Sequence, residues 1–438
     1  MYEEQRLDRP ALRELQSVKL RHLIAEIIPG NPFWNEKLAA AGIEASAIRS
    51  VSELLDLPFV TKTQVAEDQR KSPPYGSNLT YPLERYVRLH ETSGTTGEGM
   101  RWLDTPESWD WFMRCWAIIY DACGVRPGER FFFPFSFGPF IGFWAAFEAA
   151  QRLGHFCMAG GGMSSSARLR AIVEHGITVI GCTPTYALHL AQTAAAEGID
   201  LAGSAVRALI VAGEPGGSLP SVRERIEDGF GARVFDHTGM TEIGALGTEC
   251  CENPGHVHLI ESECIAELID PASGELLFSP GADCNELPEP VEGELVLTNL
   301  GRLGSPLIRY RTGDMVRLQT GRCPCGRHYV RMVGGIIGRS DDMLIIRGNN
   351  VYPSAIDSVI REVPGVAEYQ VVIDETSGMT TVEIAMEPAE DVGDAEALAR
   401  QLRQLIKDRL FFHATVTPVE CGSLPRFELK ARRFTRRR

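Results

Sequence analysis

The chain has 438 residues, 44% of them apolar, and this length suits two or three domains better than one core. The formal charge is 44 − 58 = −14, which excludes a general nucleic-acid binder because such proteins need a basic face. The charged N-terminus lacks an apolar signal-peptide core, and Pro134, Gly138, Pro139 and Gly142 interrupt the richest apolar run. That run falls short of the roughly 20 apolar residues of a membrane helix. We therefore expect a cytoplasmic protein that binds neither membrane nor nucleic acid, and the 11 cysteines favour free thiols or a metal site.

Three kinds of pattern follow one another along the first three quarters of the chain. Apolar residues at helical spacing predict short helices over residues 12–45, interrupted at residues 29–32, which read Pro-Gly-Asn-Pro. From about residue 85 to 235, helical runs alternate with short β-rich runs, which predicts a parallel α/β sheet. Residues 262–320 change to paired strands around a turn at 271–274, which predicts a β-rich subdomain.

A new succession of strands and helices begins after residues 338–342. A β-like run, a turn at 347–350, a helix from Pro353, strands near 367–387 and a helix over about 394–410 predict an α+β module. We thus predict an α/β fold with two domains: residues 1–338, helical over about 1–80 and β-rich over about 245–335, and residues 339–438. The last nine residues hold six positive charges, and we interpret them as a solvated tail or as an attractor for a polyphosphate ligand.

A phosphate-binding loop is the first chemical motif. Residues 91–97 read Glu-Thr-Ser-Gly-Thr-Thr-Gly, in which glycines let the backbone approach an anion and hydroxyls donate hydrogen bonds. No Gly-Lys-Ser/Thr follows at Walker spacing, so a P-loop kinase is disfavoured. A cluster of this kind is also typical of a plain turn, and the other motifs decide between the two interpretations.

Four further motifs follow in order. Residues 236–242 read Asp-His-Thr-Gly-Met-Thr-Glu, where a carboxylate beside a triphosphate suits Mg²⁺. Residues 310–314 end in an acidic side chain that suits paired ribose hydroxyls. Gly338-Arg-Ser-Asp-Asp342 and Leu424-Pro-Arg-Phe-Glu-Leu-Lys430 complete the set.

With these five motifs the chain resembles the adenylate-forming superfamily, and within it the phenylacetate-CoA ligase-like branch of aryl-CoA ligases. The resemblance runs from Asn31-Pro-Phe-Trp34 to Ala431-Arg-Arg433, and its most branch-like stretch is residues 338–353. Residues 212–215, Ala-Gly-Glu-Pro, are similar to the adenine-side segment of this branch.

The resemblance implies a role for each motif. The phosphate grip comprises Thr92, Ser93, Gly94, Thr95, Thr96 and Gly97. The adenine side comprises Gly213, Glu214, Pro215, Asp236, His237, Thr238 and Gly239. Thr241 and Glu242 would hold phosphate and Mg²⁺, Asp314 and Arg339 the ribose, and Lys430 would bridge carboxylate and α-phosphate. Asp341 would be the hinge on which the small C-terminal domain moves between two half-reactions.

The sequence departs from the family pattern at two positions, and other functions stay open beside this interpretation. Glu98 follows the loop where the family usually has lysine, and Leu429 precedes Lys430 where glycine is usual. The expected product is an aryl-CoA thioester made with ATP, Mg²⁺ and coenzyme A. Transfer to a carrier-protein phosphopantetheine or an amine, a non-catalytic binding homologue, and a homodimer stay open.

Cysteines predict a second metal site. Cys323-Pro-Cys325-Gly presents two thiols on one turn, and Cys250 lies upstream with His256 and His258. Three thiolates and one imidazole form a closed tetrahedral set for structural Zn²⁺. Similarity to the branch favours His258 over His256, and Cys251 stays open as a spare ligand.

An aromatic segment over residues 131–144 is similar in position to the acyl pocket of the branch. Flat rings and glycine gaps suit a planar aromatic acid. We expect Phe137, Gly138, Phe140 and Ile141 to form the wall, although core packing is the ordinary role of each ring.

Overall fold

The computed structural model describes residues 3–92, 99–282, 286–346, 349–376, 380–427 and 432–437. Short helices open the chain, as predicted. The Asp8 side chain accepts a hydrogen bond from Ala11 N at 3.0 Å and starts the first long helix. Asn31 caps the next helix in the same way, with Pro32 as its first residue, so the break at residues 29–32 is confirmed. The helical segments of this region are η1 (Glu3–Arg6), α1 (Arg9–Ile27), α2 (Pro32–Ala41), η2 (Ala45–Ala47), η3 (Glu53–Asp56), α3 (Lys62–Lys71) and η4 (Leu83–Arg85).

The predicted parallel sheet forms one half of a large sheet. Its strands lie in the order β7-β6-β5-β3-β4 and all pair in parallel. Side chains alternate between its two faces: Phe132 packs with α6, α7 and α8, whereas Phe131 and Phe133 pack in the main core with α4. These strands are β3 (Arg130–Phe133), β4 (Phe156–Ala159), β5 (Val179–Cys182), β6 (Ala208–Val211) and β7 (Arg233–Met240). The helices are α4 (Pro106–Ala122), α5 (Trp144–Arg152), α6 (Ser165–Glu174), α7 (Pro184–Glu197) and α8 (Pro220–Phe230).

Antiparallel strands extend this sheet without a break. Strand β7 pairs in parallel with β6 on one side and antiparallel with β8 on the other, giving a 12-stranded sheet over the described residues. The β-rich region therefore continues the parallel sheet edge to edge and shares its core. A separate hairpin, β1 (Arg88–Glu91) and β2 (Arg101–Asp104), flanks the phosphate loop. The antiparallel strands are β8 (Gly244–Thr248), β9 (His256–Leu259), β10 (Cys264–Ile269), β11 (Leu276–Phe278), β12 (Val291–Asn299), β13 (Tyr310–Gln319) and β14 (Arg331–Arg339).

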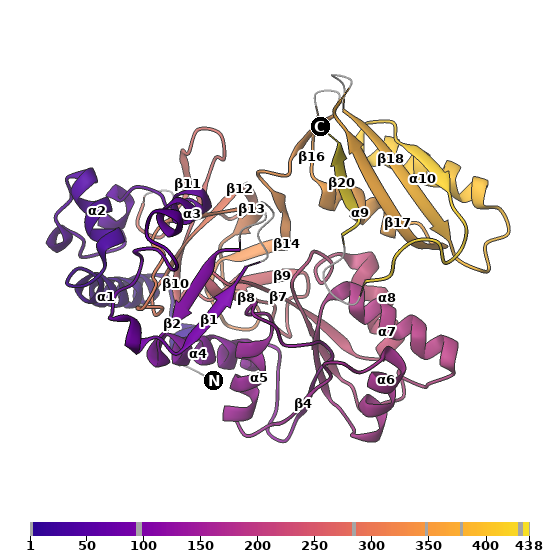
Figure 1. Cartoon of the computed structure of the whole chain (residues 1–438), viewed down its shortest axis with the longest axis horizontal. Helices are drawn as coiled ribbons and strands as arrows, with labels where there is room; N and C mark the ends of the chain where they lie inside the picture. Colours follow the sequence, from indigo (N-terminus) through magenta and orange to yellow (C-terminus); the bar gives the residue numbers. More distant parts are fainter. Residues whose placement is uncertain are drawn as a thin grey trace.

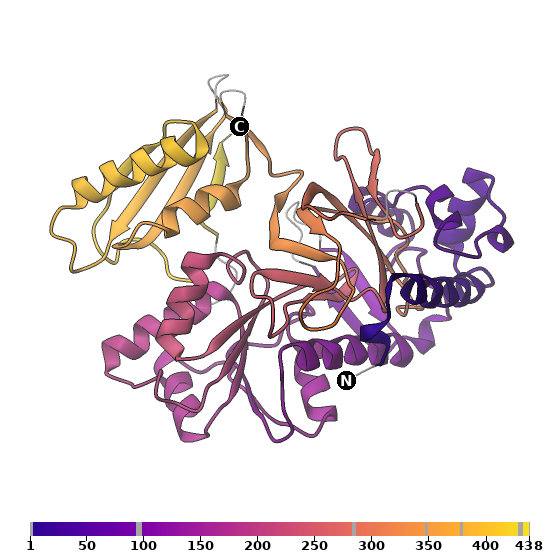
Figure 2. The ribbon, with the colours of Figure 1, turned by 180° about the vertical axis from the view of Figure 1, so that it is seen from behind.

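The C-terminal module, residues 344–437, has its own hydrophobic core and a four-stranded sheet of order β19-β18-β17-β20. Figures 1 and 2 show it as a separate body beside α7 and α8. The predicted fold class, α/β with a smaller C-terminal α+β part, is confirmed. Its elements are β15 (Leu344–Ile346), β16 (Asn349–Val351), α9 (Pro353–Arg361), β17 (Val366–Asp374), β18 (Thr381–Pro388), α10 (Ala395–Leu410), β19 (Thr415–Pro418) and β20 (Phe434–Arg437).

The basic tail forms a strand that the sequence pattern did not predict: Phe434–Arg437 is β20 and pairs in parallel with β17, while Arg437 stays exposed. The Arg433 side chain just before this strand is buried. Separately, none of the described helices is both long enough and apolar enough to cross a membrane.

Candidate active site

The phosphate loop joins the two strands of the β1–β2 hairpin. At its start, Thr92 N donates to Met100 O at 2.9 Å, and Met100 N donates back to the Thr92 hydroxyl at 3.1 Å. A side chain at Gly99 would meet Thr92 O at 2.4 Å, so the loop closes only with glycine there. Residues 93–97 of the predicted phosphate grip (Ser93, Gly94, Thr95, Thr96, Gly97) lie outside the described residues, and so does Lys430.

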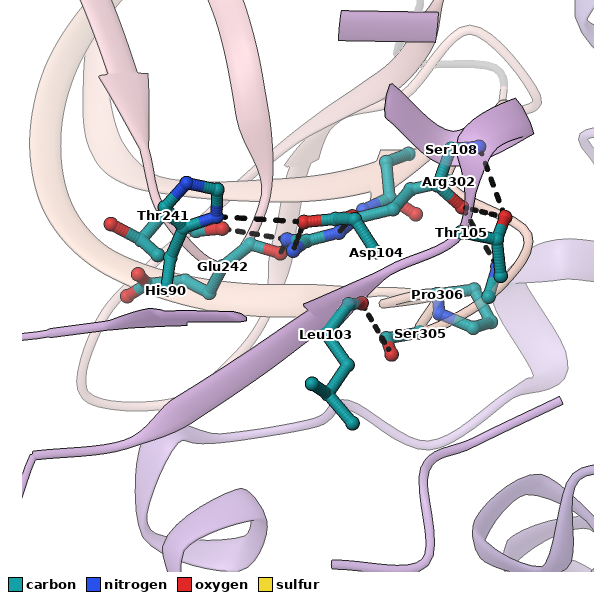
Figure 3. A network of polar contacts seen from close by, with 12 residues as sticks. His90, Leu103, Asp104, Thr105, Ser108, Thr241, Glu242, Arg302, Ser305 and Pro306 are labelled. Atoms are coloured by element: carbon teal, nitrogen blue, oxygen red, sulfur yellow. Dashed lines mark hydrogen bonds and ion pairs between the residues drawn. The ribbon is translucent and has the colours of Figure 1, made fainter. Parts of the chain in front are cut away.

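Thr241 and Glu242 form the turn between β7 and β8, and a buried arginine holds this turn. Arg302 donates to the carbonyl oxygens of Thr241 at 2.6 Å and Glu242 at 2.9 Å. Figure 3 shows the same guanidinium pairing with Asp104 on β2, at 2.7 and 2.8 Å. Burial acts to raise the pKa of Asp104, but Arg302 outweighs it and the pKa lies below its ordinary value.

The Glu242 carboxylate accepts a hydrogen bond from one described residue: its Oε1 accepts the Tyr310 hydroxyl at 3.3 Å. The side chains of Glu242 and the preceding Thr241 are both half-buried. An oxygen donor set of this kind fits Mg²⁺. Burial, followed by the Glu242 charge, raises the pKa of Tyr310 well above its ordinary value, so the phenol stays a hydrogen-bond donor.

The adenine-side residues meet where β6 and β7 end. Val211 at the end of β6 pairs with Asp236, and the Asp236 carboxylate accepts the Ser218 hydroxyl at 2.5 Å. Gly213 has φ +94°, a backbone conformation that favours glycine. Pro215 follows in the same turn, and Thr238 and Gly239 continue along β7. Segment 213–218 is thus held against β7.

Burial changes the protonation of two β7 residues. It raises the pKa of Asp236 to about 7, together with the nearby Glu249 charge. It lowers the pKa of His237 to about 4, so this imidazole is neutral near pH 7. His237 Nδ1 lies 2.6 Å from Gly247 O and its ring lies 4.4 Å from that of Trp116. His237 is therefore a buried, neutral wall residue.

The residues predicted to bind the ribose and the residue predicted to be the hinge form one ionic cluster. Asp314 on β13 is the register partner of Arg339 on β14, and Arg339 Nη1 lies 3.1 Å from Asp314 Oδ1. The same guanidinium also pairs with Asp341 at 2.9 Å. Strand β14 lies near the adenine side as well, since a Cβ on Gly335 would be 3.1 Å from Asp236 Oδ2.

The aromatic segment lies between β3 and α5, and its residues divide into two groups. Phe131, Phe132 and Phe133 are core residues of β3, whereas Phe137, Gly138, Phe140 and Ile141 are half-buried in the following loop. Trp144, the last residue of the aromatic segment, and Phe147 of α5, which the sequence analysis did not name, lie 4.5 and 5.3 Å from the Phe137 ring.

Hydrogen bonds tie this loop to the phosphate loop. The Trp144 indole donates to Gly138 O at 3.0 Å, and Glu91 N donates to Pro139 O at 2.7 Å. The candidate acyl wall is therefore attached to the strand that leads into the phosphate loop.

Cys250, His258, Cys323 and Cys325 lie together, with their ligand atoms within 4.8 Å of one another. Two sulfurs, of Cys250 and Cys323, are 3.8 Å apart, and Cys325 Sγ is 3.7 Å from His258 Nε2. A tetrahedral zinc with bonds of about 2.3 Å holds its sulfurs about 3.8 Å apart, so the set fits this ion. Hydrogen bonds from the Cys250 and Cys323 thiols lower the pKa of Cys325, which favours the thiolate that a metal needs. His256 is half-buried and lies outside the set.

Comparisons with known proteins show the family to which this chain belongs. Residues 348–438 match the family described as AMP-binding enzyme C-terminal domain. The phenylacetate-coenzyme A ligase of Thermus thermophilus is 31% identical, over 96% of this chain and 95% of that protein. The phenylacetate-coenzyme A ligase of Escherichia coli is 30% identical, over 96% and 93%. The architecture and site thus define an adenylate-forming enzyme. This chain belongs to the phenylacetate-coenzyme A ligase family.

Solved structures of one related ligase indicate which arrangement of the module is seen here. A 2-hydroxyisobutyryl-CoA ligase in its postadenylation state, with an acyl-adenylate, is 28% identical and matches with a TM-score of 0.91 over 99% of this chain and 91% of that chain. The same ligase in its thioesterification state matches with 0.73 over the same shares. The C-terminal module therefore sits in an arrangement like the postadenylation one.

Proposed function

We propose that this protein joins an aromatic carboxylic acid to coenzyme A in two steps. In the first, the carboxylate attacks the α-phosphorus of ATP, giving an acyl-adenylate and pyrophosphate. In the second, the coenzyme A thiol attacks the acyl carbon and AMP leaves. The observation that carries the proposal is the convergence of motifs far apart in sequence: segment 213–218, β7, the Thr241–Glu242 turn and β13–β14 all meet through the contacts described above.

The first step brings two anions together, so its catalysis depends on position and on positive charge. We assign the phosphate grip to residues 92–97 and the ribose to Asp314 and Arg339. Thr241 and Glu242 would hold Mg²⁺, which neutralises phosphate charge when bound. Lys430 would supply the remaining cation at the reacting carboxylate. We place the boundary of the moving module at residues 338–342, with Asp341 as hinge.

The acid is proposed to be aromatic because rings line the loop that is tied to the phosphate loop. The Phe137 ring contacts Trp144 in a tilted and Phe147 in an edge-on arrangement, and such rings offer flat surfaces to a planar substrate. The Cys250, His258, Cys323 and Cys325 set would hold a structural Zn²⁺ that joins two loops of the β-rich region and takes no part in either step.

Pyrophosphate exchange into ATP, over a panel of benzoic, phenylacetic, cinnamic, aminobenzoic and short hydroxy acids, tests the function and names the acid class. We expect pyrophosphate exchange with at least one aromatic acid. In Lys430→Ala this exchange should fall by more than about a hundredfold. Absence of exchange across the panel would refute the activity. Parallel reactions with coenzyme A, holo-carrier protein or an amine identify the acceptor, because only the true acceptor is consumed as AMP is released.

A further inference from the structure

A small cavity separates the main body from the C-terminal module, and both sides of it carry charged side chains. Helices α7 and α8 form one wall, and α9 and β17 form the other. The two described ends of the segment that bears Lys430 also line it. The lining residues used below are Thr185, Arg225, Arg361, Glu368, Phe427 and Arg433.

Arg433 is the buried charge in this interface. Its side chain pairs with Glu368 of β17 at 2.5 and 2.9 Å and lies between the rings of Tyr369 and Phe427, at 5.3 and 5.4 Å. These contacts all lie within the module and fix the guanidinium. Among the described residues, one hydrogen bond of Arg433 crosses to the main body: Arg433 Nη1 donates to the Thr185 hydroxyl at 3.3 Å. The negative charge of Glu214 on the main body also attracts this guanidinium.

Thr185 is itself tied to the predicted nucleotide site. It lies at the start of α7, and its backbone N–H donates to Glu214 Oε1 at 2.8 Å. Glu214 belongs to the adenine-side segment. The Arg433–Thr185 bond therefore connects the strand after Lys430 to the residues that would line the adenine.

A like-charge pair opposes this attachment. Arg225 on α8 and Arg361 on α9 face the same cavity from opposite sides. Arg361 pairs with Asp357 at 2.7 Å. Within the part of the chain that the structure describes, Arg225 has no ion-pair partner. Arg225 is an exposed residue, and partial burial, and next the Arg361 charge, lower its pKa.

We propose that Arg433 is a positioning residue that docks the C-terminal module for the first half-reaction by binding Thr185, while Arg225 and Arg361 repel and keep the docking reversible. The inference rests on the proposed function. A module that must leave after the adenylate forms needs a reversible interface, and the like-charge pair offsets part of the attraction that this charge-assisted hydrogen bond supplies.

Thr185→Val is the central variant, because it removes the acceptor and leaves the Arg433–Glu368 pair intact. Thr193→Val is its matched control: Thr193 is on the same helix, but its hydroxyl bonds back to His189 O at 2.8 Å. Thr185→Val should lower pyrophosphate exchange about five- to tenfold. Thioester formation from supplied acyl-adenylate and coenzyme A should stay unchanged, and Thr193→Val should alter neither rate. Equal losses in both half-reactions, or a Thr185→Val variant that behaves like Thr193→Val, would overturn the proposal.

Replacing Arg225, one member of the like-charge pair, should slow the second half-reaction instead of the first. Arg225→Glu places a carboxylate opposite Arg361 and should slow thioester formation about two- to fivefold while exchange is retained, with Arg225→Ala in between. Unchanged thioester formation in Arg225→Glu would refute the role of the repulsion.

A measurement on the free enzyme, which requires no catalysis, tests the docking role of Arg433 independently of the proposed activity. Hydrogen–deuterium exchange of the free enzyme should be faster over α9 and the start of α7 in Thr185→Val than in Thr193→Val. This difference is expected even if no acid in the panel is activated. If wild-type enzyme exchanges pyrophosphate but the two variants show equal deuterium uptake, the docking role fails and the activity stands.

Discussion

Arg302 and Asp104, which are 198 residues apart in sequence, form a bidentate ion pair in which both side chains are 0% exposed. The remaining nitrogen of the guanidinium donates to the carbonyls of Thr241 and Glu242. His90, on the strand that leads into the phosphate loop, lies 3.9 Å from the Asp104 carboxylate. One buried pair thus connects both parts of the predicted triphosphate site.

Arg302→Met should lower the free energy of unfolding by about 3–5 kcal/mol, because it leaves Asp104 buried without its cation. Urea titration measures this loss. The double variant Asp104→Leu/Arg302→Met should regain most of the stability but not pyrophosphate exchange, since the Thr241 and Glu242 carbonyls stay without their donor. Recovery of both would show that the pair has no positioning role.

Arg309 supplies the control. It forms a similar buried bidentate pair with Glu267 and also donates to two backbone carbonyls, of Leu55 and Leu57, away from the site. Arg309→Met should lower stability by a similar amount, while exchange per folded molecule stays at the wild-type rate.

Cys323→Ser should abolish the bound zinc of the purified protein, from about one ion per chain to almost none, because three ligands hold the ion poorly. Elemental analysis measures the content, and the midpoint of thermal unfolding should fall with it. Cys251→Ser is the matched control, since its sulfur lies outside the cluster. A wild-type protein without zinc would refute the metal assignment.

Asp236→Asn should change the dependence of stability on pH. Burial raises the pKa of Asp236 from 3.8 to about 7, so between these values the folded state binds more protons than the unfolded chain. The contribution of this group to stability is therefore present at low pH and falls as the pH rises toward 7. The stability of the variant relative to wild type should increase by roughly 1–3 kcal/mol from pH 4 to pH 7. Asp228→Asn, at an exposed position of α8, is the control, and a constant difference for Asp236→Asn would contradict the raised pKa.

Gly138→Ala should shift acid preference toward smaller substrates. A Cβ at this position would lie 2.9 Å from the Phe140 ring, so this ring must move, and in the proposed pocket such a movement narrows the space for the acyl group. The ratio of kcat/KM for a bulky aryl acid to that for a short aliphatic acid should fall about tenfold or more. Gly393→Ala, where a Cβ meets nothing within 4 Å, should leave the ratio unchanged. An unchanged ratio in Gly138→Ala would remove this loop from the pocket.

Local patterns predicted most of the fold. Proline and asparagine at residues 31–32 marked a helix start, and alternation of strands and helices gave the parallel sheet. Asp314 and Arg339 were identified separately by motif, and strand register then brought them together. These features depend on residues close in sequence or on one strand pairing.

Long-range polar contacts were beyond such reasoning. No spacing rule connects Asp104 with Arg302, or Thr185 with Arg433, because each pair meets only after separate elements have packed. The basic composition of the last residues concealed β20, since its pairing with β17 is set by backbone hydrogen bonds. Phe147 lies beyond the aromatic segment that the sequence singled out, and only the placement of the loop before α5 brings its ring against Phe137.

The first helices of the chain are stabilised by segments that the ribosome makes much later. The Trp34 indole donates to Pro306 O, 272 residues away, and Gln16 donates to the carbonyls of Glu261 and Cys264. At roughly 5–20 residues per second, translation takes about 15–50 s to supply these partners. During that interval the faces of α1 and α2 that pack on these segments stay without these partners, so the N-terminal helices reach their final packing only late in synthesis.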